Sequence, residues 1–175
     1  MRKLSLSMFL VFFITIATIF SLEVHADSLE EDQIKEFIKA NNYMPLDQAI
    51  SEFEQQVQRE VSLPSKLPFT PSYQLGKISN EGDLQIHYLS VIDNQQQDFV
   101  FYIMYPDSKL DKHLTESDKV ITLNDQSKAF YRENSVHLRS LAFKKNGFGY
   151  LIGGNPQQNE MYSVEGLLEI ANSTQ

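Results

Sequence analysis

The chain has 175 residues, with 15 basic and 23 acidic side chains and no cysteine. Its net charge of −8 disfavours a nucleic-acid-binding protein, because neutralising phosphates requires a basic surface. The lack of cysteine excludes a disulfide scaffold, cysteine-ligated zinc, a thiol nucleophile and a lipidated N-terminal cysteine. With 42% hydrophobic and 22% charged residues, the composition is that of a globular domain, neither disordered nor a polytopic membrane protein.

The first 26 residues have the pattern of a secretory signal peptide, which is removed on export. A basic pair, Arg2-Lys3, precedes an uncharged stretch from Met8 to Phe20, and Ala26 ends a short segment suited to cleavage. The apolar stretch is shorter than the roughly 20 residues of a membrane-spanning helix. Cleavage after Ala26 is therefore predicted, with an uncleaved anchor as the alternative. In both cases the folded part is secreted or extracytoplasmic.

Residues 27–175 are expected to form a single domain that buries a core without disulfides. Its helical section, residues 27–60, opens with a capping-box pattern at Ser28 and Glu31, and the first helix is expected to end at Asn41-Asn42. A second helix is expected to begin near Pro45. It carries one apolar stripe, made of Leu46, Ile50, Phe53 and Val57. Such a stripe typically packs on its own domain, and a partner-binding surface is the alternative.

The second section, residues 61–175, is expected to hold a sheet and a C-terminal helix. Three prolines within residues 64–71 disfavour a helix or a central strand and predict an extended connection. Alternating and continuous apolar runs predict the strands that follow. These runs are Tyr73–Ser79, Leu84–Ile92, Phe99–Tyr105, Val120–Leu123, Lys128–Glu133, Val136–Lys144 and Phe148–Ile152.

Turn signals organise these strands. The runs Leu84–Ile92 and Phe99–Tyr105 flank a polar loop, Asp93–Asp98, which predicts a hairpin. Both faces of Phe99–Tyr105 are apolar, which predicts a central strand covered on both sides. The charged residues 106–119 predict a surface loop, and Asn146-Gly147 predicts a tight two-residue hairpin turn.

The last helix is expected over Ser163–Ser173, with Ser163 as its N-cap. The hairpin spacing is inconsistent with βαβ units, so the predicted fold class is α+β. It comprises two N-terminal helices, a mostly antiparallel sheet of about six or seven strands and a C-terminal helix.

Catalytic and metal-binding motifs are missing from the sequence. There is no Gly-rich phosphate loop, no nucleophile elbow and no His-Glu-x-x-His. The three histidines of residues 27–175, His87, His113 and His137, are far apart in sequence, so metal binding would require the fold to gather them. The acids of the 106–119 loop alternate with lysines, which indicates a solvated loop rather than a calcium site. No metal and no cofactor are expected.

Aromatic side chains are the most suggestive feature of the predicted strands. Tyrosine joins a large apolar body to a polar tip, which suits binding surfaces, and a sheet covered by helices can enclose an apolar ligand. The candidate binding residues are Tyr88, Tyr102, Tyr131 and Tyr150. The alternative is that these side chains belong to the core and to cross-strand pairs.

Several short motifs between Val61 and Ser173 occur in the order typical of one family. They are Leu67-Pro68, Pro71-x-Tyr73, a strand ending in Tyr88, Lys128-Ala129-Phe130-Tyr131, the stretch Leu141–Tyr150 and the closing segment Leu167–Ser173. On these motifs the chain resembles an uncharacterised bacterial extracytoplasmic domain found in secreted proteins, lipoproteins and anti-sigma-type regulators. The resemblance implies an α+β domain exposed outside the membrane, and it carries over no functional residues.

Together these observations predict a secreted, non-enzymatic domain that binds a small ligand, an envelope component or a protein partner. The alternative is a secreted hydrolase whose acid/base carboxylates are brought together by the fold. Nucleic acid is not an expected partner, and the membrane is expected to be involved only through an uncleaved signal segment.

Overall fold

The computed structural model describes residues 31–92, 95–135, 138–157 and 160–175, and the predicted signal peptide lies outside them. In chain order the elements are α2 (Glu31–Ala40), β1 (Met44–Pro45), α3 (Leu46–Val57), β2 (Tyr73–Ile78), β3 (Leu84–Ile92), β4 (Gln95–Met104), the 3-10 helix η1 (Asp107–Lys112), β5 (Lys119–Thr122), β6 (Lys128–Ser135), β7 (Leu138–Lys145), β8 (Phe148–Gly154), the 3-10 helix η2 (Glu160–Tyr162) and α4 (Val164–Asn172). No helix within these residues is long and apolar enough to span a membrane.

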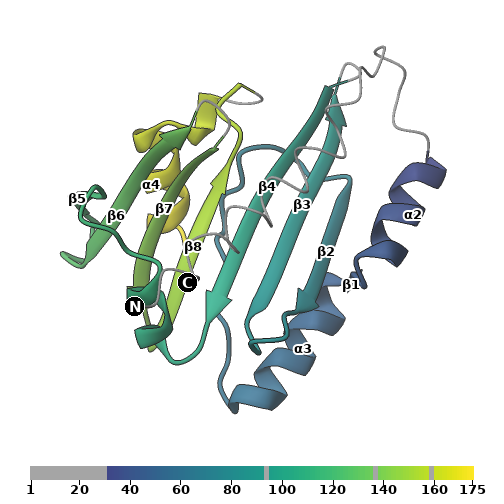
Figure 1. Ribbon diagram of the computed structural model, residues 1–175, viewed down its shortest axis with the longest axis horizontal. Helices are drawn as coiled ribbons and strands as arrows, with labels where there is room; N and C mark the ends of the chain where they lie inside the picture. The colour runs from purple at the N-terminus through teal and green to yellow at the C-terminus, as the bar shows by residue number, and fades with distance from the viewer. Residues whose placement is uncertain (1–30, 93–94, 136–137, 158–159) are drawn as a thin grey trace, which may run out of the picture.

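The sheet consists of two four-stranded meanders joined at its centre (Figure 1). The strand order is β1-β2-β3-β4-β8-β7-β6-β5, and neighbouring strands are antiparallel. β4 and β8 pair from Phe99 with Gly154 to Met104 with Gly149, so strands far apart in the sequence meet in the middle. This arrangement confirms the α+β class, the antiparallel sheet and the central position of the strand with two apolar faces.

The predicted number of strands, six or seven, was wrong, because the sheet has eight. The additional strand is β1, in which Met44 pairs with Gly76 and Pro45 with Leu75. Two residues are too few to show the alternation by which a strand is recognised. The proline is accommodated because β1 lies at the edge of the sheet. The helix expected near Pro45 begins directly after it.

Several turns and caps form where local residue patterns predict them. The Ser163 hydroxyl accepts a hydrogen bond from the Gly166 amide at 3.2 Å and caps α4 as predicted. Asn146 and Gly147 have φ values of 53° and 80°, which is the expected tight hairpin turn with two left-handed residues. Asn42, with φ of 55°, ends α2 in the left-handed conformation. The capping box expected at Ser28 lies outside the described residues.

Two predicted loops are shorter or more ordered than expected. β4 begins at Gln95, so most of the predicted loop at residues 93–98 belongs to the strand or lies outside the described residues. The predicted surface loop at residues 106–119 contains η1, whose Leu110 is fully buried. Leu110 packs on β8 at Gly149, where an added Cβ would lie 2.7 Å from the Leu110 Cβ. The Asp107 amide also donates to the Gly147 carbonyl at 2.9 Å, and the Lys109 ammonium pairs with Asp83 at 2.7 Å. Loop composition does not reveal such contacts.

The main core lies between the sheet and the two helices α3 and α4, and we call this side of the sheet the helix face. Helix α3 contributes Leu46 and Phe53, and α4 contributes Leu167 and Ile170. The strands contribute Leu84, Ile86, Tyr88, Phe99, Phe101, Ile103, Ala129, Tyr131, Leu141, Phe143, Phe148, Tyr150 and Ile152. The apolar stripe of α3 therefore packs on its own domain.

The proline-containing connection holds the C-terminus. Pro64 forms a bridge with Thr174, and the Ser65 amide donates to the Ser173 carbonyl at 3.1 Å. The amide of Gln175 donates to the Leu63 carbonyl at 3.2 Å. The segment after α3 thus runs to β2 without forming a helix, and it is tied to the residues that follow α4.

Replacing Phe53 by Ala should lower the free energy of unfolding by about 3–5 kcal/mol, because removing a buried ring leaves a cavity. Phe53 is fully buried, with its ring centroid 6.2 Å from that of Phe148. Urea unfolding followed by circular dichroism measures the change. Gln55→Ala, on the exposed side of the same helix, is the control, with an expected change within about 0.5 kcal/mol. A similarly small loss for Phe53→Ala would contradict the packing of α3 on its own domain.

Candidate functional site

The four tyrosines selected from the sequence lie on two different faces of the sheet. Tyr88, Tyr131 and Tyr150 are buried in the main core on the helix face, whereas Tyr102 is buried in a separate cluster on the other side. Burial raises the pKa of Tyr88 to about 12 and that of Tyr150 to about 12. The structure therefore does not bring the four together into one binding surface, and their role in binding stays a prediction.

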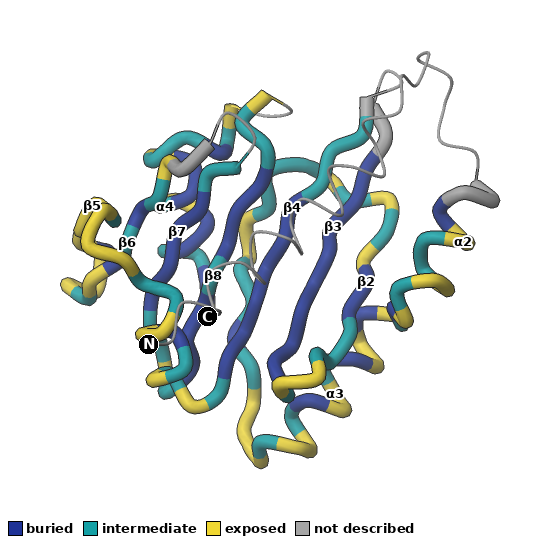
Figure 2. The backbone as a smooth tube through the Cα atoms, in the orientation of Figure 1, coloured by how far each residue is buried: buried dark blue, intermediate teal, exposed yellow. Residues whose placement is uncertain are grey.

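The sheet side that carries Tyr102 is here called the Tyr102 face. Its positions follow from the strand register, in which Gln85 lies opposite Tyr102, His87 opposite Val100, and Leu89 opposite Asp98. Helices α3 and α4 lie on the far side of the sheet in Figure 1, and α2 stands beside β2. The central strands are buried along most of their length (Figure 2), so the polar residues among these positions need partners within the protein.

A chain of hydrogen bonds links polar residues of the Tyr102 face. The Nδ1 of His87 lies 3.1 Å from Asp98 Oδ1, and its Nε2 lies 2.8 Å from the side-chain nitrogen of Gln85. The same Gln85 nitrogen lies 3.1 Å from the hydroxyl oxygen of Tyr43. His87 and Gln85 are almost fully buried. These four residues, which we call the Tyr43–Asp98 network, come from β3, β4 and the turn after α2.

The orientation of the Gln85 amide sets the donor and acceptor roles along this chain of hydrogen bonds. An amide nitrogen only donates, so Gln85 gives one hydrogen to Tyr43 and the other to His87 Nε2. His87 Nε2 therefore accepts, and its Nδ1 carries the hydrogen that Asp98 accepts. His87 thus donates through Nδ1 to the Asp98 carboxylate, which orients the ring, and accepts through Nε2 from Gln85.

Aromatic rings enclose the Tyr43 end of the network. The Tyr43 ring stacks on Phe37 at a centroid distance of 5.4 Å and meets His87 edge-on at 5.0 Å. The Lys77 ammonium lies 4.4 Å from the centre of the Tyr43 ring, within the range of a cation–π contact. Burial, with Tyr102 and Asp98 nearby, raises the pKa of Tyr43 far above its usual range. Its hydroxyl is therefore protonated at physiological pH.

Next to the network, the Tyr102 face is apolar. Val100, Tyr102 and Met104 of β4 are buried beside Ala142 of β7 and Leu110 of η1. Partly buried side chains complete this cluster, namely Leu114, Phe130 and Leu151. Burial, together with Asp98, raises the pKa of Tyr102 above its usual range. The Tyr102 face thus joins an apolar patch to a buried polar network.

The sequence predicts that His87 lies on a strand, but it does not predict the network. The available signal was a pair of polar residues, Gln85 and His87, that alternate with the apolar residues of β3. A strand whose second face is buried normally alternates two sets of apolar residues, so polar residues at i and i+2 mark a buried polar site. Asp98 and Tyr43 join it only through strand register and the path of the chain.

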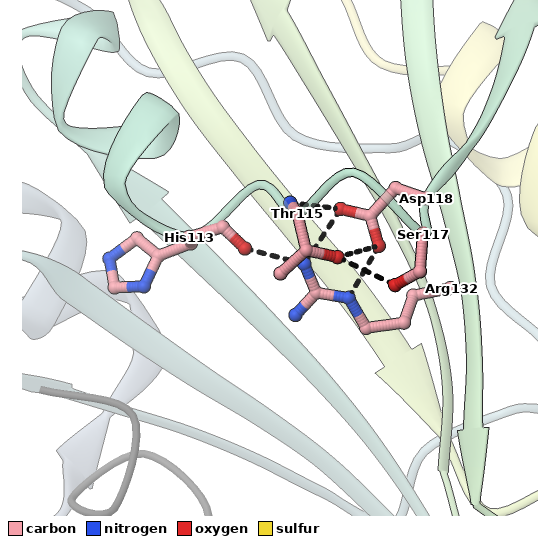
Figure 3. Close-up of polar contacts among 5 residues, drawn as sticks. All are labelled: His113, Thr115, Ser117, Asp118 and Arg132. Atoms are coloured by element: carbon pink, nitrogen blue, oxygen red, sulfur yellow. Dashed lines mark hydrogen bonds and ion pairs between the residues drawn. The ribbon is translucent and has the colours of Figure 1, made fainter. Parts of the chain in front are cut away.

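A second polar cluster fastens the loop that precedes β5 (Figure 3). Arg132 of β6 donates to Asp118 through Nε at 2.6 Å and through Nη2 at 2.7 Å. The Thr115 amide and hydroxyl also donate to Asp118, at 2.8 and 3.0 Å, and Arg132 Nη2 donates to the His113 carbonyl at 2.5 Å. Asp118 thus ties Arg132 of β6 to the loop residue Thr115, which is the arrangement of a structural clamp.

The histidines and acids considered as metal ligands lie apart. His113 stands beside the clamp, and burial lowers its pKa despite the nearby acids Glu81 and Asp83, whereas His137 lies outside the described residues. Asp111 pairs with Lys144 at 2.7 Å. Within residues 31–175, apart from the gaps in the description, no group of three or more histidines and acids is arranged to hold a metal ion.

Comparison with models of protein families, with curated proteins and with solved structures found no match to this chain.

Replacing Asp118 by Asn should lower the free energy of unfolding at neutral pH by about 2–3 kcal/mol, between the values for an exposed and a buried ion pair. The Asp118 side chain is 2% exposed and that of Arg132 is 24% exposed. Burial alone would raise the pKa of Asp118, but the hydrogen bonds from Arg132 and Thr115 outweigh it and lower the pKa.

The contribution of the Asp118 carboxylate to the free energy of unfolding is therefore complete above the pKa of an unfolded aspartate, about 3.9. It is lost as the pH falls through the lower pKa that Asp118 has in the folded protein. Urea unfolding at pH 7, 4 and 2.5 measures this loss as a shrinking difference between the wild type and Asp118→Asn. Asp111→Asn, which removes an exposed partner of Lys144, should change stability by less than about 0.5 kcal/mol. A difference for Asp118→Asn that is independent of pH would contradict the clamp.

Proposed function

We propose that this protein is a secreted, non-enzymatic binding domain and that its Tyr102 face takes a small amphipathic ligand. The observation that carries the proposal is the composition of this face, where an apolar patch adjoins a buried polar network. The main core on the helix face already joins α3, α4 and the sheet. The polar residues of the Tyr102 face thus take no part in the packing of that core.

The apolar half of the proposed site is the patch around Val100, Tyr102 and Leu151. Apolar atoms attract an apolar ligand by removing its surface from water, at about 25 cal/mol per Å². Tyr102 adds a flat ring, which can pack on a ligand. Binding sites of this kind are mostly apolar and carry a few fixed polar groups.

The polar half is the Tyr43–Asp98 network. A buried histidine, amide and carboxylate cost desolvation free energy unless their hydrogen bonds are complete. Asp98 fixes the ring of His87, and His87 in turn fixes the amide of Gln85. The Gln85 N–H is thereby held toward the Tyr102 face as an oriented donor, which suits a carboxylate or hydroxyl oxygen of the ligand.

Net charge and the expected export agree with this proposal. Cleavage after Ala26 would remove two basic residues and one acidic residue and take the net charge from −8 to −9. Recognition of polyanions by long-range charge is disfavoured at that value. The hydrolase alternative relies on acid/base carboxylates. The carboxylate of the network, Asp98, is engaged by His87 Nδ1, so the network orients a donor rather than presenting a base.

The binding proposal can be tested with dodecanoate as the probe. The chain contains no tryptophan, so Leu151→Trp introduces a single fluorescent reporter at the apolar patch. We expect a saturable change in Trp emission on titration. In that background, Val100→Thr keeps the side-chain shape but adds a hydroxyl, and it should weaken binding about three- to tenfold.

Val120→Thr is the matched control, because Val120 lies on the edge strand β5 and is 60% exposed. It should leave dodecanoate binding unchanged. Thermal unfolding of each variant verifies that it is folded. The absence of a saturable signal, or equal weakening by the two valine substitutions, would refute the proposed site.

Secretion is tested by the mass of the protein that a secreting bacterial host releases into the medium. The denaturing mass should equal that of residues 27–175, because cleavage is expected after Ala26. A full-length product that stays with the cells would contradict cleavage and indicate a membrane-anchored domain.

A further inference from the structure

The two helices at the start of the described chain are held in different ways. Helix α3 inserts Leu46 and Phe53 into the main core. Helix α2 instead packs Phe37 and Ile38 on a small separate cluster, which contains Tyr43, Leu75 and Leu89 with Tyr73 at its margin. Segments with little buried apolar contact open at lower free energy than the rest of a domain. Helix α2 is thus attached as a unit of its own.

The cap of α2 joins Tyr43 to that unit. The Tyr43 amide donates to the Ile38 carbonyl at 2.9 Å, and the Asn42 amide donates to the Lys39 carbonyl at 3.3 Å. With Asn42 left-handed at φ 55°, these two bonds form a Schellman cap. The next residue, Met44, already pairs with Gly76 of β2. The boundary between the detachable unit and the sheet therefore lies directly after Tyr43.

Helix α2 covers the polar end of the Tyr102 face. The Phe37 ring lies 6.3 Å from that of His87, and the Tyr43 ring lies 5.0 Å from it. The Tyr43 oxygen accepts the Gln85 N–H at 3.1 Å. A ligand oxygen can accept that same N–H only when Tyr43 has left, because the second hydrogen of the amide is used by His87 Nε2.

From this geometry we infer that α2 is a lid on the ligand site, and that the Tyr43 hydroxyl occupies the position of the ligand's polar group on Gln85. The inference rests on the proposed function for the identity of the site. The closed state is held by Tyr43, by the small apolar cluster and by Lys77, whose ammonium lies against the Tyr43 ring and donates to the Asn41 carbonyl at 3.5 Å. Opening at Tyr43 frees one oriented N–H donor beside the apolar patch. A carboxylate or hydroxyl oxygen attached to an apolar chain is the chemistry that replaces Tyr43.

The lid is tested by amide hydrogen exchange of the full chain, measured by mass spectrometry without any ligand. Amides of residues 35–43 should exchange at least tenfold faster than those of α3, because α2 opens without unfolding the core. Tyr43→Phe removes only the hydroxyl, and it should speed exchange in α2 about two- to tenfold while leaving α3 unchanged. Tyr73→Phe is the matched control from the same cluster and should change neither helix.

Equal protection of α2 and α3, or equal acceleration of both by Tyr43→Phe, would overturn the lid. Dodecanoate then tests the competition. If the Tyr43 hydroxyl and the probe compete for Gln85, Tyr43→Phe must tighten dodecanoate binding by about the factor by which it accelerates exchange in α2. Unchanged or weaker binding by Tyr43→Phe would overturn the competition. Failure of every variant to bind dodecanoate would instead refute the proposed site, and the exchange data decide the lid separately.

Discussion

The pairing of β4 with β8 is the contact on which the rest of the molecule depends. It is the only joint in the described sheet between a meander of residues 44–104 and a meander of residues 119–154. Gly154, opposite Phe99, has no side chain, and an added Cβ there would collide with the Tyr162 ring. Tyr162 can therefore lie flat on Phe99, at a centroid distance of 6.1 Å. The end of β8 is thus packed against the start of β4.

The same joint positions the candidate site. The Tyr162 hydroxyl donates to the backbone carbonyl of Asp98 at 2.9 Å, so the main chain of Asp98 is fixed from the helix face. Its side chain points to the opposite face and receives the Nδ1–H of His87. An aromatic contact in the core thereby determines where the carboxylate stands on the Tyr102 face. A displacement of β8 would therefore reach His87 through Asp98, and it would also reach His87 and Gln85 through Val100 and Tyr102 of β4.

Local rules of sequence were sufficient for those parts of the fold that local interactions determine. The cap at Ser163 and the turn at Asn146-Gly147 depend on a few adjacent residues, and both are present as predicted. The eighth strand and the burial of Leu110 depend on contacts with β2 and β8, which lie far along the chain. Composition and periodicity do not predict such long-range contacts.

The candidate site illustrates the same limit. Four tyrosines on predicted strands suggested one aromatic surface, but the period-two geometry of a strand separates Tyr102 from Phe101 and Ile103 on either side of it. Its face could not be matched to those of Tyr88, Tyr131 and Tyr150 without the strand order and register. Conversely, His87 lies opposite Val100, and Leu89 lies opposite Asp98. Asp98 is therefore the diagonal neighbour of His87 on the same face, and its carboxylate reaches the imidazole ring. A one-residue slip would send Asp98 to the other face.

The two polar clusters differ in whether a partner can be exchanged. In the clamp, Asp118 is charged, and its bonds come from Arg132 and from backbone and hydroxyl groups of its own loop. Removing any partner there leaves a buried charge less well compensated. In the Tyr43–Asp98 network the charge is at Asp98, while the far end is a neutral bond between Gln85 and Tyr43. Exchanging Tyr43 for another oxygen leaves the His87–Asp98 pair intact. The Gln85 N–H can therefore change its partner at the least cost in free energy, and it is the donor that α2 covers.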